Sequence, residues 1–133
     1  MLPLKKVSLD VCRRMKSLGD RYEDRAVELL TKQGVQIVQR NFRGKTGEID
    51  IIARDMNVLV FLEVRARSNR FFNGAAGSVD RRKQQRIIRT AQLFLQRHPG
   101  WASMPSRFDV IAFEPPQSGT ASRIRWIRSA FTT

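Results

Sequence analysis

The stretch that decides the fold is GEIDIIARDMNVLVFLEVRAR, residues 47–67. Residues 48–53 alternate carboxylates with isoleucines, which is the period-two pattern of a strand with two different faces. Residues 58–64 are almost continuously apolar, as is typical of a central strand covered on both sides. Between these runs, Asp55-Met56-Asn57 suits a tight turn, because Asn and Asp tolerate turn conformations. The stretch therefore predicts a β-hairpin.

The polar residues of this hairpin share one face if its loop has two residues. With residues 56–57 as the loop, Asp50 faces Glu63, and opposed residues of an antiparallel pair point to the same side. In the same register Glu48 faces Arg65. The opposite face then carries only apolar side chains, those of Ile49, Ile51, Leu62 and Val64. An odd-length loop would separate Asp50 from Glu63, so the clean division of polar from apolar residues favours the even register.

The opposed carboxylates predict a metal site. If they are buried, Asp50 and Glu63 need protons, cationic partners or a metal ion. Mg²⁺ suits them, since it takes one or two carboxylates and completes its shell with water and phosphate oxygens; Mn²⁺ is the other candidate. Glu23, beside the inward face of a helix, could be a third ligand or could support the site, and Glu48 could extend it. The alternative is a solvated sheet face on which arginines neutralise the carboxylates.

The remaining pattern predicts the order α-β-β-β-α-β-β. Apolar residues recur at helical spacing from about Gly19 or Asp20 to Lys32, and again from Asp80 to Arg97. Further strands are indicated at 35–42, 107–113 and 123–127. We expect an α/β fold of three layers, in which a mixed β-sheet lies between helices. It would form one domain over residues 19–133, preceded by a basic segment of uncertain order, residues 1–18.

Composition points to a polyanionic partner. The net charge is +13 and the pI is near 11.5, with 19 arginines and 6 lysines. The positive electrostatic field of such a protein favours polyanionic partners. Charge alone does not decide whether the partner is DNA, RNA, the ribosome or an anionic membrane. One cysteine, Cys12, excludes an internal disulfide framework. Without a signal-peptide pattern or the roughly 20 apolar residues of a membrane span, we expect a cytoplasmic protein with no membrane partner.

Basic residues around the second helix predict phosphate contacts. Arg81, Arg82 and Lys83 occupy its first turn, where cations oppose the helix dipole. Exposed backbone N–H groups beside three cations form a ready site for phosphate. Arg67, Arg70 and Arg86 extend this predicted nucleic-acid-binding surface near the end of the hairpin. A merely solvated charged face is the alternative.

Several motifs carry a family resemblance. They are the runs 47–53 and 60–67, Glu23 with Ala26, Asn41, Lys83, Ala91, and the run Arg107-Phe108-Asp109-Val110. Together they resemble the small bacterial YraN family, also called UPF0102, over about residues 19–113. That family is assigned to the restriction-endonuclease-like superfamily and is similar to archaeal Holliday-junction resolvases. The resemblance implies a PD-(D/E)xK-type nuclease core.

The resemblance also implies roles for particular residues. Asp50 matches the first metal-binding Asp, Glu63 the second acidic residue, and Glu23 the Glu often found on the first helix. Arg65 stands where the motif has Lys. An Arg is always protonated and cannot act as a base, but it can stabilise charge in the transition state. Lys83 could supply the missing amine if the start of its helix reaches the site.

We therefore expect a Mg²⁺- or Mn²⁺-dependent endonuclease acting on DNA, with Asp50, Glu63 and Arg65 as its catalytic residues. The resemblance favours a structure-selective substrate such as branched or junction DNA, and junction resolution would require a homodimer. One alternative is a non-catalytic nucleic-acid-binding protein with a degenerate nuclease site. Another is a small basic protein associated with RNA or the ribosome.

Overall fold

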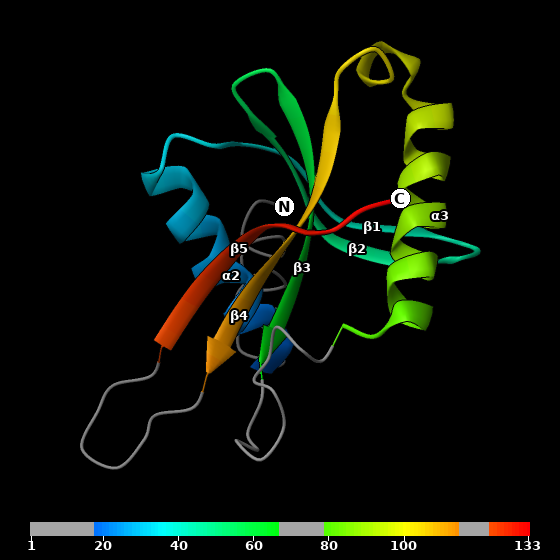
Figure 1. Cartoon of the computed structure of the whole chain (residues 1–133). Helices are drawn as coiled ribbons and strands as arrows, with labels where there is room; N and C mark the ends of the chain where they lie inside the picture. Colours follow the sequence, from blue (N-terminus) through cyan, green and yellow to red (C-terminus); the bar gives the residue numbers. More distant parts are fainter. Residues whose placement is uncertain (1–17, 67–78, 115–122) are drawn as a thin grey trace, which may run out of the picture.

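Two α-helices flank a five-stranded sheet in the computed structural model of the chain, which describes residues 18–66, 79–114 and 123–133 (Figure 1). In chain order the elements are α2 (Leu18–Lys32), β1 (Gln36–Gly44), β2 (Gly47–Asp55), β3 (Val58–Ala66), α3 (Arg81–Arg97), the short 3₁₀ helix η2 (Pro99–Trp101), β4 (Ser106–Glu114) and β5 (Arg123–Phe131). The predicted basic segment 1–18 lies almost wholly outside the described residues. No helix within the described ranges is long and apolar enough to cross a membrane.

The sheet has the order β1-β2-β3-β4-β5 and is mixed, as predicted. Only β3 and β4 run parallel, while the other neighbouring pairs are antiparallel. β3 is the central strand, and residues 59–63 of it are buried, which confirms the interpretation of its continuous apolar run. β5 continues to Phe131, beyond the predicted end at Ile127.

The β2–β3 hairpin has the predicted even register. Asp55 pairs with Val58, and the ladder continues to Ile51 and Leu62. The loop is thus Met56-Asn57, with Met56 in the left-handed region at φ 55°. A non-glycine residue in that region is uncommon, and the side chain of Met56 is exposed to solvent at this turn.

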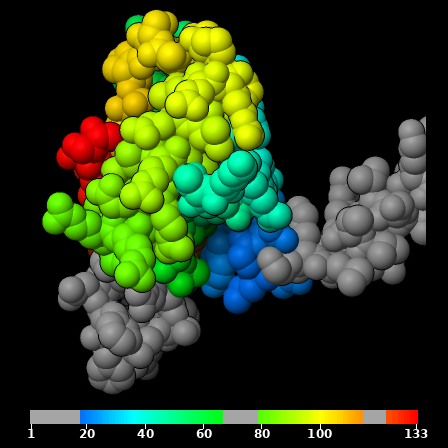
Figure 2. All heavy atoms as spheres, turned by 90° about the vertical axis from the view of Figure 1, so that its right-hand side faces the viewer, coloured from blue at the N-terminus to red at the C-terminus, as the bar shows by residue number. Residues whose placement is uncertain are grey.

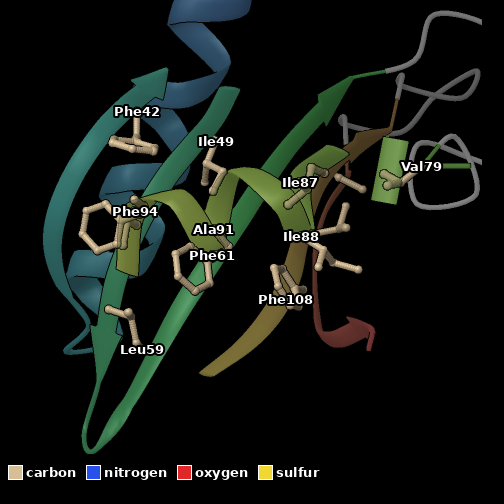
Figure 3. Packing of buried hydrophobic residues seen from close by; sticks show 13 residues of the cluster. Phe42, Ile49, Leu59, Phe61, Val79, Ile87, Ile88, Ala91, Phe94 and Phe108 are labelled. Atoms are coloured by element: carbon tan, nitrogen blue, oxygen red, sulfur yellow. The ribbon is translucent and has the colours of Figure 1, made fainter. Parts of the chain in front are cut away.

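Each face of the sheet is covered by one helix. Figure 3 shows the α3 side, where Ile87, Ala91 and Phe94 lie against strand residues including Phe61. The Phe94 ring makes an edge contact with that of Phe42, with centroids 5.2 Å apart. On the opposite side, α2 buries Ala26 and Leu30 against a second cluster that includes Ile51, Val60, Leu62 and Ile111. The helices therefore lie on opposite faces, as the three-layer prediction requires.

One prediction about the hairpin is wrong. Ile49 does not share a face with Ile51, because Ile49 packs in the α3-side cluster and Ile51 in the α2-side cluster. The regular alternation of side chains between the two faces of the sheet therefore fails between Ile49 and Ile51, at Asp50. The ladder of β2 with β3 ends at Ile51, and the Asp50 carboxylate then accepts the Val64 N–H at 2.8 Å. A side chain thus takes a donor that a continuing antiparallel ladder would pair with backbone.

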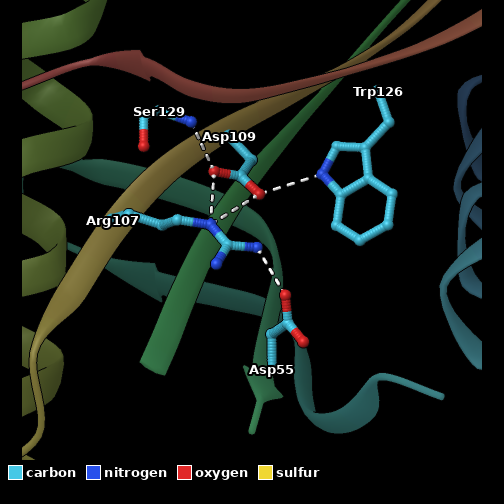
Figure 4. Close-up of polar contacts among 5 residues, drawn as sticks. All are labelled: Asp55, Arg107, Asp109, Trp126 and Ser129. Carbon is cyan, nitrogen blue, oxygen red and sulfur yellow. Dashed lines mark hydrogen bonds and ion pairs between the residues drawn. The ribbon is translucent and has the colours of Figure 1, made fainter. Parts of the chain in front are cut away.

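A buried polar network ties together β2, β4 and β5 near the loop end of the hairpin (Figure 4). Asp109 is fully buried and accepts hydrogen bonds from Arg107 Nε at 3.1 Å, Trp126 Nε1 at 2.9 Å and the Ser129 N–H at 2.9 Å. Arg107 Nη2 also donates to Asp55 at 2.8 Å. The buried carboxylate is fully compensated, as burial of a charge requires.

Candidate functional site

The candidate site lies where β2 and β3 part. Beyond the ladder's end, Asp50 of β2 and Glu63 of β3 line two hollows, one on each side of the sheet. The α2-side hollow, about 290 Å³, is also lined by Tyr22 and Glu23. The α3-side hollow, about 180 Å³, is lined by basic residues of α3 together with Gly47, Glu48 and Ile87. The two carboxylates therefore stand between the helices and face both openings.

Glu63 is a buried carboxylate held by cations. Its side chain is 6% exposed, and its Oε1 lies 2.9 Å from Lys83 Nζ and 3.8 Å from Arg65 Nη1. The cap of α3 directs Lys83 to this position, since the Asp80 side chain accepts the Lys83 N–H at 2.8 Å and begins the helix there. The start of α3 thus reaches the site, which was the condition for Lys83 to supply an amine.

The electrostatics of Asp50 favour its protonated form. Burial, followed by the neighbouring carboxylate of Glu63, raises the pKa of Asp50 to about 8. The hydrogen bond from the Val64 N–H acts in the opposite direction. A cation placed beside Asp50 would reverse this balance, because it stabilises the ionised carboxylate.

Glu23 supplies a third carboxylate on the α2 side. Burial raises its pKa, and Arg40 opposes that shift. Its Oε1 is buried and has no hydrogen-bond partner among the described residues, with Arg40 Nη2 at 3.9 Å. A buried acceptor without a donor carries a free-energy cost, and Glu23 shares its hollow with Asp50 and Glu63. The oxygen is therefore available to a donor or cation that enters this hollow.

The predicted partnership of Glu48 with Arg65 is wrong. Glu48 pairs with Arg43 of β1, and Arg43 Nε lies 3.4 Å from Glu48 Oε1. The β2–β3 ladder ends before it reaches Glu48. Arg65 lies instead beside Glu63. Glu48 still lines the α3-side hollow, so it stands at the edge of the site.

The donor set fits a hard divalent cation that brings most of its own ligands. Across the described ranges, no three or more His, Cys, Asp or Glu side chains are grouped so as to hold a metal ion by themselves. Mg²⁺ commonly takes one or two carboxylates and keeps waters or phosphate oxygens, which Asp50 and Glu63 at an open hollow could satisfy. The partnerless Oε1 of Glu23 adds an acceptor nearby. Metal binding by these residues stays a prediction.

The predicted phosphate-binding residues separate into two groups. Arg86 lines the α3-side hollow with Lys83, next to the carboxylates. Arg81 and Arg82 are exposed on the outer face of α3, where they line a different hollow. Arg67 and Arg70 lie outside the described residues.

Comparison with known proteins gives the family. The sequence model of the uncharacterised protein family UPF0102 matches residues 22–113. The chain belongs to the UPF0102 family. A UPF0102 protein of Alcanivorax borkumensis is 46% identical over 123 residues, covering 92% of this chain and 98% of that relative. A UPF0102 protein of Halorhodospira halophila is 48% identical over 113 residues, 85% of each chain. The YraN/UPF0102 resemblance seen in the sequence motifs is thereby confirmed.

The UPF0102 match covers the site but not the last strand. Its range includes Glu23, Asp50, Glu63 and Lys83, and it ends at Phe113, before β5 begins. Sequence reasoning assigned Lys83 to phosphate contacts and gave it a role in the site only conditionally. A stronger signal was available, because the face of the helix that carries the buried Ile87 also carries Lys83, four residues earlier.

Proposed function

We propose that this UPF0102 protein is a metal-dependent endonuclease with a restriction-endonuclease-like core, acting on DNA. The observation that carries the proposal is the convergence of Asp50, Glu63 and Lys83 at the opening between β2 and β3. Two carboxylates and an amine beside an open hollow match the residue types of a PD-(D/E)xK centre. The net charge of +13 supports a polyanionic substrate.

Each residue has a role in the proposed reaction. Hydrolysis joins a water oxygen to phosphorus and breaks one P–O bond of the backbone, leaving a phosphate end and a hydroxyl end. Asp50 and Glu63 would hold Mg²⁺ or Mn²⁺, whose chemistry when bound is to polarise the phosphate and lower the pKa of water. Lys83 would donate hydrogen bonds to the attacking water or to a phosphate oxygen, and Arg65 would stabilise negative charge in the transition state.

The carboxylates at the margin would tune this centre. Glu23 would accept a hydrogen bond from a water in the α2-side hollow through its partnerless Oε1. Glu48 would add negative charge at the edge of the α3-side hollow. Arg86, in the same hollow, would hold a phosphate oxygen next to the scissile bond.

A second function has its own support. Glu63 already has Lys83 at 2.9 Å, so the buried charge is compensated without a metal. Arg65 cannot act as a base. Both features favour a nucleic-acid-binding protein in which the acidic pair has become structural. Binding assays do not separate the two functions, because affinity falls steeply with salt for either.

Cleavage of defined substrates tests the proposal. Linear, flapped and four-way DNA substrates of equal length would be incubated with the protein in Mg²⁺, in Mn²⁺ and in chelator. We expect metal-dependent cutting of at least one substrate, faster on branched than on linear DNA, and none in chelator. Absence of cutting on every substrate, or equal cutting in chelator, would contradict the proposal.

A matched variant guards against a contaminating nuclease. Glu63→Gln keeps the size of the side chain and the possibility of a hydrogen bond with Lys83, but removes the charge that would hold the metal. The variant should bind the substrates and fail to cut them. If it cuts at the rate of the unaltered protein, the activity does not belong to this site.

A further inference from the structure

The outer side of α3 carries an arginine surface, of which the proposed reaction uses only Arg86. Arg81, Arg82, Arg86 and Arg89, with Gln85, line an open hollow of about 520 Å³. We define these five residues as the α3 basic face. All are exposed. Figure 2 looks directly onto α3, with the β1–β2 turn beside it.

The charges on this face have one sign. α3 contains six basic residues and no Asp or Glu between residues 81 and 97. Within the described parts of the chain, no acidic side chain forms an ion pair with the four arginines of the face. The nearest acid in sequence, Asp80, is engaged as the helix cap. Like charges at this spacing repel one another and destabilise a helix slightly, so the pattern is not explained by the folding of α3.

The other helix shows what an ordinary solvated surface looks like in this protein. α2 mixes four acidic residues with three basic ones over residues 18–32. Mixed charges at helical spacing stabilise an exposed helix. The two helices therefore differ in the charge of their exposed surfaces, and the surface of α3 suits a negatively charged ligand.

The spacing of the arginines fits a phosphodiester backbone. From Arg81 to Arg89 the helix rises about 12 Å. Because one strand of a duplex carries a phosphate for about every 3.4 Å of the duplex axis, more than one phosphate lies within reach over this length. Guanidinium groups bind phosphate oxygens bidentately, so arginines spread along the helix can contact successive phosphates of a backbone.

Arg86 connects this face to the candidate site. It lines the outer hollow with the other arginines and also the α3-side hollow with Lys83 and Glu63. A nucleic-acid backbone lying along α3 would thus remain in contact with basic residues from the α3 basic face to the carboxylates. The Thr46 and Thr90 hydroxyls are hydrogen-bonded at 2.7 Å, which holds the β1–β2 turn against α3.

We propose that the α3 basic face binds the sugar-phosphate backbone of duplex DNA and leads one strand to the acidic pair. The inference deepens the proposed nuclease function by naming the surface on which the substrate docks. We assign the contacts to phosphates and not to bases, since Arg82, Arg86 and Arg89 recur at helical spacing on one side of α3. Affinity should therefore depend on salt and little on sequence.

The test is the salt dependence of binding to a fluorescent 20-base-pair duplex, measured in chelator so that no cleavage intervenes. The triple variant Arg81→Gln/Arg82→Gln/Arg89→Gln leaves Arg86 in place because that residue also borders the carboxylates. Losing three phosphate contacts should reduce the slope of log K against log salt by about 2 to 3 and weaken binding at low salt by roughly tenfold or more.

A charge-matched control separates a local surface from the overall charge. Arg21→Gln/Lys32→Gln/Arg123→Gln also lowers the net charge by three, at exposed positions outside α3. The slope of log K against log salt for this control should stay within about 1 of the slope for the unaltered protein. The addition Gln85→Lys should steepen the slope by about 1. Circular dichroism would verify that each variant is folded.

Equal losses in the two triple variants, or no loss in the α3 variant, would overturn the proposal. A protein that binds through α3 but cuts nothing would retain this inference and lose the nuclease function. A protein that cuts DNA while its α3 variant binds normally would retain the nuclease function and lose this inference.

Discussion

Lys83 and Glu63 form an ion pair of 2.9 Å between the start of α3 and the end of β3. The pair joins elements that are separated in the chain by residues 67–80. It holds the first turn of α3 over the point where β2 and β3 part, and it compensates a carboxylate whose side chain is 6% exposed. The pair therefore links the stability of the α3 start to the composition of the candidate site.

Replacing Lys83 by Met should destabilise the protein by about 1–3 kcal/mol, because Glu63 loses its nearest cation while remaining buried. The measurement is urea unfolding at pH 7. The double variant Lys83→Met/Glu63→Gln should recover part of the loss, since the uncompensated charge is then gone. Arg82→Gln, on the exposed side of the same turn, should change stability by no more than about 0.5 kcal/mol. Equal effects of Lys83→Met and Arg82→Gln would refute a structural role for the pair.

The raised pKa of Asp50 predicts a pH dependence. Its pKa is 3.8 ordinarily and about 8 in the folded protein, so between these values the folded state binds more protons than the unfolded state. The contribution of Asp50 to stability is thus fully present below about pH 4 and is lost as the pH rises towards 8. Asp50→Asn removes this loss. In chelator, the free energy of unfolding of Asp50→Asn, relative to that of the unaltered protein, should rise by roughly 1–3 kcal/mol between pH 5 and pH 8. A difference between the two proteins that does not change with pH would contradict the raised pKa.

Binding of Mg²⁺ should release protons. At pH 7 the Asp50 carboxyl is largely protonated in the metal-free protein, and a divalent cation would displace that proton. Calorimetry in buffers of different ionisation enthalpy should give a release of about one proton per ion at pH 7, and less at pH 9. Glu28→Gln, which removes an exposed carboxylate from α2, should release as many protons as the unaltered protein. Proton release that is unchanged in Asp50→Asn would assign the ion to another site.

The Asp109 network should contribute strongly to stability without contributing to the site. Asp109→Ala leaves three donors and the charge of Arg107 in a buried setting, so we expect a loss of about 3–5 kcal/mol in urea unfolding. Arg125→Gln breaks an ion pair with Glu114 whose arginine is about half exposed, and should cost no more than about 1 kcal/mol. Similar losses in the two variants would contradict the importance assigned to the buried network.

The hairpin shows what a residue pattern can predict. The even loop at Met56-Asn57 followed from the requirement that polar and apolar residues separate, and the register of the ladder confirms it. The same rule failed at Ile49, because it assumes that strand alternation continues. Asp50 interrupts the ladder by taking the Val64 N–H with its side chain. Nothing in the alternating sequence marks where two strands part.

Contacts between distant elements were harder to predict. The approach of Lys83 to Glu63 depends on how α3 lies on the sheet, which no local pattern defines. The α3 basic face was incomplete in the sequence analysis, although Arg82, Arg86 and Arg89 recur at helical spacing. Asp109 entered the sequence analysis only as part of a family motif, although a carboxylate inside an apolar strand indicates a buried partner. Trp126 and Ser129 could not be named as its donors without the register of β5.

The most direct test of the central claim is the single-turnover cleavage rate of the best DNA substrate in Mg²⁺, compared between the unaltered protein, Asp50→Asn and Glu28→Gln. If Asp50 holds the catalytic ion, Asp50→Asn should be slower by at least about 100-fold, while Glu28→Gln should cut at the unaltered rate. Equal rates for all three proteins, or a loss of the same size in Glu28→Gln, would show that the acidic pair between β2 and β3 does not carry the reaction.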